Sequence, residues 1–188
     1  MRKLTLIAHT SLDGFVAGEN GELDGFKAGA ENLAFVVGLT QTADAALFGR
    51  VSYQLLEKYW PSAKDIPGAT EGEVAYSKWY NKTEKIIVSR TLEGQVMGIT
   101  AILSENVVAR IVAIKEQAGK DILIFGSPSV SQLLMAENLI DDYRICINPV
   151  IFGKGIPLFT RSEELKKLQL ISTRQFPNGE LALHYIRC

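Results

Sequence analysis

In three short segments, residues suited to binding phosphate directly follow an apolar run. These residues are glycine, serine, threonine or arginine. Gly49-Arg50 follows the first run, Ser89-Arg90-Thr91 the second, and Gly126-Ser-Pro-Ser the third. Glycine lets a ligand approach the backbone closely, and the planar arginine fork matches the oxygens of a phosphate. A helix N-terminus adds backbone N–H groups and a positive dipole end. The three segments are therefore candidates for holding one phosphorylated ligand.

The second and third segments indicate which phosphates are bound. Hydroxyl groups and an arginine at a strand end, as in Ser89-Arg90-Thr91, suit a ribose 2′-phosphate and select NADP over NAD. In the third segment, Ser127 is predicted at the N-cap of a helix and Pro128 at its first position. Ser129 and the first-turn amides can then hold a pyrophosphate. Taken alone, Ser89-Arg90-Thr91 is equally typical of a polar loop that closes a strand, and Gly126-Ser-Pro-Ser of an ordinary capped helix. Gly49-Arg50 alone also fits a tight turn with a solvated arginine. The Gly-x-Gly-x-x-Gly fingerprint of a standard Rossmann site is absent.

Two carboxylates are candidates for the catalytic and substrate side of the site. Asp13 lies in a glycine-rich segment after the first apolar run. A carboxylate beside an apolar ring has a raised pKa and can donate a proton or accept a hydrogen bond. The alternative is that Asp13 bonds the backbone of its own turn. Glu31 opens the next predicted helix, where it either reaches the same cleft or, as we favour, complements the helix dipole.

Apolar runs and helical patterns alternate along the first two thirds of the chain, and the last third is rich in β-structure. Strands are predicted at 4–8, 44–48, 85–88, 99–103, 121–125, 143–152, 167–175 and 181–187. Helices are predicted at 30–42, 50–58, 73–80, 104–118 and 128–135, with Ser104 as the N-cap of the fourth. Glycine and proline mark 11–21 and 61–72 as loops, and Pro177-Asn-Gly is a hairpin signal.

This order of elements predicts an α/β fold in a single domain over residues 1–188. We expect a mixed, mostly parallel sheet of about eight strands, with helices on both faces and an antiparallel C-terminal hairpin. In open sheets, ligands gather at the carboxyl ends of parallel strands. The segments around Gly49, Ser89 and Gly126 are all predicted at such ends, so we expect them to meet along one groove.

Composition limits the classes of function. The chain has 188 residues, of which 47% are hydrophobic and 22% charged, with a formal net charge of −1. This near-neutral balance gives no long-range attraction to nucleic acid or anionic lipid, and no run has the length of a membrane span. We expect a cytoplasmic protein with a small-molecule partner and neither a nucleic-acid nor a membrane partner. The two cysteines (Cys146, Cys188) and two histidines (His9, His184) are expected to be scattered, with no metal site and with both histidines as strand residues.

These segments, in this order, resemble the dihydrofolate-reductase-like superfamily, and within it the reductase domain of riboflavin biosynthesis. The motifs that carry the resemblance are Ser11-Leu-Asp-Gly-Phe-Val-Ala-Gly, Asp44-Ala-Ala-Leu-Phe-Gly-Arg-Val-Ser-Tyr, Lys85-Ile-Ile-Val-Ser-Arg-Thr, Ile124-Phe-Gly-Ser-Pro-Ser and Ile140-Asp-Asp-Tyr-Arg. The resemblance implies an NADPH-dependent oxidoreductase that transfers hydride to a small pterin- or pyrimidine-like heterocycle, and it implies a homodimer. The positions that match cofactor contacts are Gly49, Arg50, Ser89, Arg90, Gly126, Ser127 and Ser129.

The resemblance also assigns family positions to Asp13 and Glu31. This chain differs from riboflavin reductases at two of their motifs. Asp13 matches the substrate-side loop, and Glu31 falls near the acidic position at the start of the corresponding helix. Riboflavin reductases carry a lysine where this chain has Ile7, and a Gly-x-x-Thr segment where it has Gly49-Arg-Val-Ser-Tyr. Both departures argue against a ribose-phosphate pyrimidine as substrate. The alternative function is an NADP(H)-binding sensor or regulator of the same fold that performs no turnover.

Overall fold

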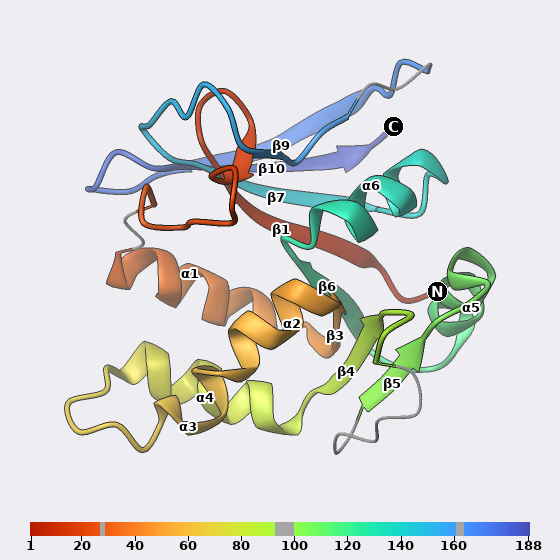
Figure 1. Ribbon diagram of the computed structural model, residues 1–188, viewed down its shortest axis with the longest axis horizontal. Helices are drawn as coiled ribbons and strands as arrows, with labels where there is room; N and C mark the ends of the chain where they lie inside the picture. The colour runs from red at the N-terminus through yellow and green to blue at the C-terminus, as the bar shows by residue number, and fades with distance from the viewer. Residues whose placement is uncertain (27–28, 93–99, 161–163) are drawn as a thin grey trace. The chain divides into compact units, whose positions relative to one another are not determined.

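The computed structural model of the chain describes residues 1–26, 29–92, 100–160 and 164–188 (Figure 1). Its strands are β1 (Leu4–Thr10), β2 (Phe15–Ala17), β3 (Ala43–Gly49), β4 (Glu84–Val88), β5 (Thr100–Leu103), β6 (Asp121–Phe125), β7 (Asp142–Ile147), β8 (Ile156–Pro157), β9 (Leu168–Gln175) and β10 (Leu181–Arg187). Its helices are α1 (Ala30–Thr40), α2 (Arg50–Glu57), α3 (Trp60–Ala63), α4 (Glu71–Lys82), α5 (Val107–Glu116) and α6 (Pro128–Ala136). No helix among these described residues is long and apolar enough to cross a membrane.

The strands form an eight-stranded sheet in the order β5-β4-β3-β6-β1-β7-β10-β9, and β2 pairs with β8 in a separate sheet. The ladders β3–β4, β4–β5 and β1–β7 are parallel, whereas β10 runs antiparallel to β7 and β9. The predicted α/β class, with a mostly parallel sheet and an antiparallel C-terminal hairpin, is confirmed.

The residues group into two compact units, which are described separately. The first unit contains residues 1–2 and 29–123, and the second contains residues 3–28 and 124–188. Neither unit is one continuous stretch of the chain. The single domain expected over residues 1–188 stays a prediction.

In the first unit, the parallel strands have nearly continuous apolar sequences. Ala45–Phe48 on β3 and Ile86–Ile87 on β4 are all buried. Parallel strands are covered on both faces, so they need such uninterrupted runs. The register pairs Gly49 with Val88, so that β3 and β4 end side by side.

The predicted loop 61–72 is partly helical, which corrects the sequence-based prediction. It contains most of α3, and α4 begins before the predicted residue 73. Thr70 and Glu73 form a capping box, in which each side chain accepts a hydrogen bond from the other residue's backbone N–H at 3.2 and 2.8 Å. This reciprocal pair starts the helix at Glu71. Ser104 is likewise not an N-cap, because α5 starts at Val107 after the left-handed Asn106 (φ 50°).

In the second unit, β1 extends further and β7 is shorter than predicted. β1 continues to Thr10, whereas β7 ends at Ile147 rather than at 152. Pro149 follows closely and has no N–H to donate to a ladder, which explains the early end. The predicted hairpin is confirmed, with Gly179 donating to the carbonyl of Phe176 at 3.0 Å.

The predicted loop 11–21 also contains a short strand. β2 pairs with β8, and this pairing brings the loop after β1 against the chain after β7. The close approach requires a glycine at position 155, because a Cβ there would lie 2.3 Å from the carbonyl oxygen of Ala17. Short strands of this kind have no periodic signal in the sequence.

Candidate functional site

The carboxyl ends of β3 and β4 carry the first two predicted phosphate-binding segments. Because Gly49 pairs with Val88, the Gly49-Arg50 and Ser89-Arg90 segments begin next to each other at one edge of the sheet. α2 starts directly at Arg50, and Gly49 is its extended N-cap residue with no side-chain capping bond. The exposed Arg50 guanidinium donates to Gln54 Oε1 at 3.1 Å. The structure therefore brings two of the three predicted segments together.

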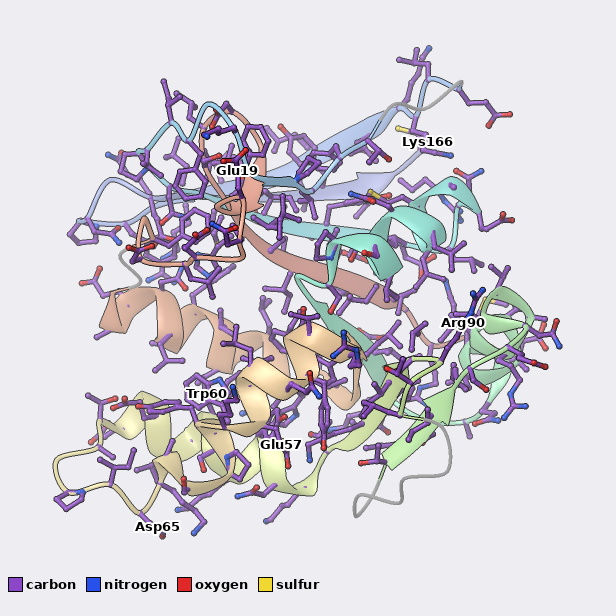
Figure 2. All side chains as sticks on the ribbon, viewed as in Figure 1. Glu19, Glu57, Trp60, Asp65, Arg90 and Lys166 are labelled. Carbon is purple, nitrogen blue, oxygen red and sulfur yellow. The ribbon has the colours of Figure 1, made fainter. Side chains whose placement is uncertain are left out.

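Ser89 orders the turn that follows β4. Its hydroxyl oxygen accepts hydrogen bonds from the backbone N–H groups of Thr91 (3.2 Å) and Leu92 (3.1 Å). Its own backbone N–H donates to the carbonyl of Leu103 on β5 at 3.0 Å. A serine that folds its own turn in this way fixes the loop. The side chains left exposed on this turn are those of Arg90, labelled in Figure 2, and Thr91.

The third segment forms a left-handed turn after β6 in the second unit. Gly126 and Ser127 both have positive φ angles, 54° and 48°. A Cβ on Gly126 would meet no atom within 4 Å, so the space beside its backbone is open. The exposed Ser129 lies in the first turn of α6.

Ser127 occupies the predicted N-cap position of α6 but does not cap the helix. Its hydroxyl donates to the carbonyl of Phe125 at 2.9 Å, and no side-chain capping bond is made. N-cap residues that bond the helix amides have extended backbones. The left-handed backbone of Ser127 instead directs the hydroxyl back toward β6. The capping prediction is therefore corrected, while Pro128 does stand in the first turn as predicted.

Asp13 joins two loops of the second unit. Its Oδ1 accepts from the backbone N–H of Phe152 at 3.1 Å, and its Oδ2 accepts from that of Gly153 at 2.7 Å. A hydrogen bond with the Ser11 side chain lowers the pKa of Asp13 most, burial opposes this, and the two amides lower it further. The raised pKa expected from the sequence is therefore wrong. At neutral pH Asp13 is an ionised acceptor that binds a neighbouring loop.

We expect replacement of Asp13 by alanine to release the loop at residues 152–153. The amides of Phe152 and Gly153 lose their acceptor, so their hydrogen exchange should accelerate by at least about tenfold. Because folding lowers the Asp13 pKa below its ordinary value of 3.8, its contribution is present above that pH and is lost as pH falls through the lower, folded-state pKa. Amide exchange and carboxyl NMR titration measure both effects. A carboxyl midpoint at or above 3.8 would contradict the assignment.

Glu31 lies exposed in the first turn of α1. A carboxylate there complements the positive end of the helix dipole, which is the role that the sequence favours. Glu31 belongs to the first unit and Asp13 to the second. Their predicted action on one substrate stays a prediction.

A shallow hollow lies beside Phe152 in the second unit. Its charged lining consists of Glu19, Glu22, Asp24 and Lys154, and Lys154 pairs with Glu19 at 2.6 Å. The excess of carboxylates disfavours phosphate at this position. Phe152 stacks on Phe26 with 5.1 Å between the ring centroids, which gives the hollow an apolar wall. The hollow therefore suits an uncharged ring better than a phosphate.

The structure also brings together three side chains that sequence reasoning kept apart. His9, Cys146 and Glu180 of the second unit each offer a ligand atom, and these atoms lie within 4.8 Å of one another. The expectation that the cysteines and histidines are scattered is therefore wrong for His9 and Cys146. Both histidines are strand residues, as predicted, in β1 and β10. The sequence alone does not reveal this cluster, because it depends on the strand register that pairs His9 with Cys146.

Comparison with models of protein families identifies the family of this chain. The family model described as the RibD C-terminal domain matches residues 2–182. The chain belongs to this family. Two Bacillus subtilis (strain 168) relatives are both described as uncharacterized. YyaP is 30% identical over 184 residues, covering 98% of this chain and 94% of YyaP, and YwjB is 30% identical over 189 residues, covering 99% and 98%.

Solved structures show that the chain has the dihydrofolate-reductase-like fold. A candidate riboflavin biosynthesis protein from Shewanella sp. PV-4 has a TM-score of 0.75 at 20% identity, with 99% of each chain covered. The Thermotoga maritima diaminohydroxyphosphoribosylaminopyrimidine deaminase/5-amino-6-(5-phosphoribosylamino)uracil reductase has 0.69 at 16% identity, covering 100% of this chain and 57% of that one. Dihydrofolate reductase from Enterococcus faecalis, complexed with NADP(H) and RAB-propyl, has 0.64 at 14% identity, covering 98% and 96%. The family resemblance seen in the sequence is confirmed.

Proposed function

We propose that this chain is an NADPH-dependent reductase that transfers hydride to a small heterocyclic substrate. The observation that carries the proposal is the side-by-side position of Gly49-Arg50 and Ser89-Arg90 at the carboxyl ends of two parallel strands. This is the edge at which open α/β sheets bind ligands. Membership of the RibD C-terminal domain family and the fold shared with an NADP(H)-bound dihydrofolate reductase support it.

The residues of the first unit fit a phosphorylated dinucleotide. The exposed guanidinium of Arg90 and the hydroxyl of Thr91 suit the 2′-phosphate that distinguishes NADPH from NADH. Arg50 and the N-terminus of α2 suit a second phosphate, because the helix end adds N–H donors and a positive dipole. When bound, NADPH supplies the hydride, and these residues hold and orient it.

The second unit holds the residues expected to contact substrate. The left-handed turn at Gly126-Ser127 leaves open space beside the backbone, and the contact with a cofactor phosphate expected of this turn and of Ser129 stays a prediction. Asp13 fixes the loop after β1 in place by bonding the loop at Phe152. Ile7, in place of the lysine of riboflavin reductases, favours an unphosphorylated pterin- or pyrimidine-like ring over a ribose-phosphate pyrimidine. A small electron-poor ring is therefore our proposed substrate class.

A sensor of the same fold is the second candidate. The observation that favours it is that Asp13, one of the two expected acid–base residues, is occupied by backbone amides and has a lowered pKa. An ionised carboxylate cannot donate a proton at neutral pH. A sensor binds NADPH without oxidising it when pterin- and pyrimidine-like compounds are added, whereas a reductase oxidises it with at least one of them.

Thermal melting with NADPH, with NADH and without ligand tests the cofactor assignment. NADPH at about 100 times its dissociation constant should stabilise the folded protein by about 2.7 kcal/mol, because it binds only the folded state. NADH at the same concentration should stabilise it less, since it lacks the 2′-phosphate. No shift with NADPH at millimolar concentration would refute both the reductase and the sensor.

A further inference from the structure

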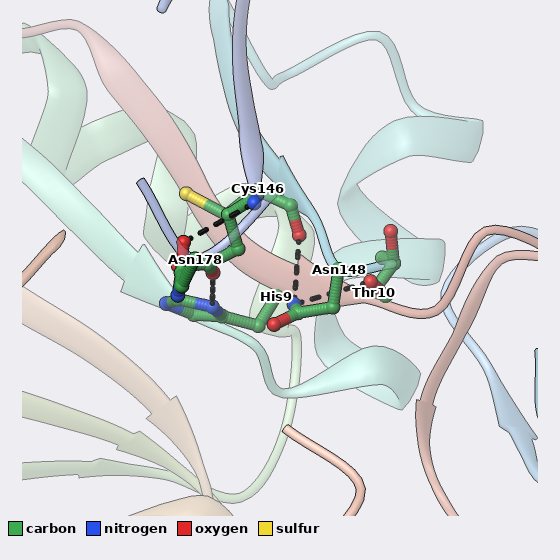
Figure 3. A network of polar contacts seen from close by, with 6 residues as sticks. His9, Thr10, Cys146, Asn148 and Asn178 are labelled. Atoms are coloured by element: carbon green, nitrogen blue, oxygen red, sulfur yellow. Dashed lines mark hydrogen bonds and ion pairs between the residues drawn. The ribbon is translucent and has the colours of Figure 1, made fainter. Parts of the chain in front are cut away.

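We propose that His9, Cys146 and Glu180 form a binding site for one divalent transition-metal ion, with zinc as the best-matched ion. The three side chains belong to the second unit, and none of them is assigned to the NADPH site proposed above. One imidazole, one thiol and one carboxylate are the three ligand types that zinc takes in proteins. Figure 3 shows His9 and Cys146, both labelled, in one network of polar contacts.

Strand register places the three groups together. His9 on β1 is the parallel partner of Cys146 on β7, so both side chains stand on the same face of the sheet. Cys146 in turn pairs with Ala182 on β10, and Glu180 lies just before that strand in the hairpin turn. The backbone ladders therefore hold all three residues in place before any ion binds.

The distances require only small side-chain adjustments. Nδ1 of His9 lies 2.9 Å from Oε1 of Glu180, and the three ligand atoms all lie within 4.8 Å of one another. Zinc–ligand bond lengths place neighbouring ligand atoms of a tetrahedral site about 3.3–3.6 Å apart. The His9–Glu180 pair must open by about half an ångström, and the thiol must approach by at most about 1.5 Å. Rotation of the partly exposed His9 ring, whose side chain is 28% exposed, can provide this movement.

Burial and charge favour an ion at this position. Cys146 and Glu180 are both 0% exposed. A buried carboxylate is costly unless an opposite charge compensates it. A divalent ion with one thiolate, one carboxylate and one neutral imidazole gives a neutral cluster. Nδ2 of Asn178 donates to Oε2 of Glu180 at 3.0 Å, a contact of the kind that orients metal-binding carboxylates.

The ligand types select among ions. Sulfur and nitrogen ligands disfavour Mg²⁺ and Ca²⁺, which bind through oxygen, and favour zinc and its later transition-metal neighbours. Three protein ligands are the number found in zinc sites that keep a fourth position open for water or substrate. The exposed part of His9 marks the side from which such a ligand would enter.

The chain offers a matched control. Nε2 of His184 lies 2.7 Å from Oδ1 of Asp142, the same kind of histidine–carboxylate pair on the same sheet. Asp142 already has Lys3 as a cationic partner at 3.4 Å. Among the described residues, only the His9–Glu180 pair has a cysteine thiol, that of Cys146, beside it. Cys188, the other cysteine, is exposed.

Cobalt titration of the full-length, reduced and metal-free protein tests the site. Wild-type protein should show a thiolate-to-cobalt absorption band in the near ultraviolet and visible bands typical of tetrahedral cobalt, and zinc should displace both. The Cys146→Ser variant should lose the near-ultraviolet band. His9→Gln and Glu180→Gln should each weaken cobalt binding by at least about tenfold. The controls His184→Gln and Cys188→Ser should bind as wild type does.

Three results would overturn the site: absence of the thiolate band in wild-type protein, its persistence in Cys146→Ser, or equal weakening by His184→Gln. Circular dichroism checks that each variant is folded. Should Glu180→Gln not fold, Cys146→Ser still decides, because serine closely matches the size of cysteine. NADPH binding is measured on the same samples, so failure of the metal site and failure of the reductase assignment are distinguished.

Discussion

Arg50→Ala and Arg90→Ala should each weaken NADPH binding by about tenfold or more while leaving folding almost unchanged. A hydrogen bond to a charged group contributes about 1.5–3 kcal/mol, which corresponds to roughly 10- to 150-fold in affinity. Both side chains are exposed, and Arg50 donates a hydrogen bond to Gln54 within its own helix. Surface substitutions of this kind change stability by about 0.5 kcal/mol or less. Isothermal titration and a thermal melt of each variant measure the two quantities.

The two variants should differ in their effect on cofactor preference. Arg90→Ala should reduce the preference for NADPH over NADH, because we place Arg90 at the 2′-phosphate. Arg50→Ala should weaken both cofactors alike, because the phosphate assigned to it is common to both. Arg110→Ala removes an exposed arginine from α5 of the same unit and is the matched control, with no expected loss. Unchanged NADPH affinity in both Arg50→Ala and Arg90→Ala would remove the basis of the cofactor site.

The parts of the fold that were predictable are those with a strong periodic signal. β6 was predicted with its observed bounds, and β3 and β4 within one residue at each end, because their apolar runs are continuous and turn residues follow them. β2 and β8 were missed because strands of two or three residues carry no period. α3 and the start of α4 escape prediction because proline and glycine in 61–72 are typical of a loop, whereas the helix start depends on the capping pair Thr70 and Glu73.

The candidate site was predictable in its positions and less so in its local chemistry. The sequence placed Gly49 and Ser89 at strand ends, and the β3–β4 register bears this out. It did not reveal that Ser89 binds its own turn, that Ser127 is left-handed, or that Asp13 bonds a distant loop. These depend on backbone angles and on contacts between segments far apart in the chain. The expected meeting of all three phosphate-binding segments involves both units and stays a prediction.

Phe48→Ala should be the most destabilising of the substitutions considered, lowering the free energy of unfolding by about 3–5 kcal/mol. Phe48 is 0% exposed at the end of β3. Its ring lies 6.2 Å from that of Tyr53 and 6.3 Å from that of Tyr80, so truncation leaves a cavity lined by aromatic rings. For a chain of this length the loss corresponds to a fall in Tm of roughly 6–20 °C. Chemical denaturation and thermal melting measure both values.

The same substitution links packing to function, because Phe48 directly precedes Gly49 and Arg50. The ring anchors the strand end against α2 through Tyr53, so the cavity should also loosen the turn that presents Arg50. We therefore expect NADPH affinity to fall even at temperatures where the variant is fully folded. Val51→Ala is the control, since Val51 is 68% exposed in the same region and its truncation opens no cavity. A Phe48→Ala variant as stable as Val51→Ala would show that this aromatic cluster does not support the strand end.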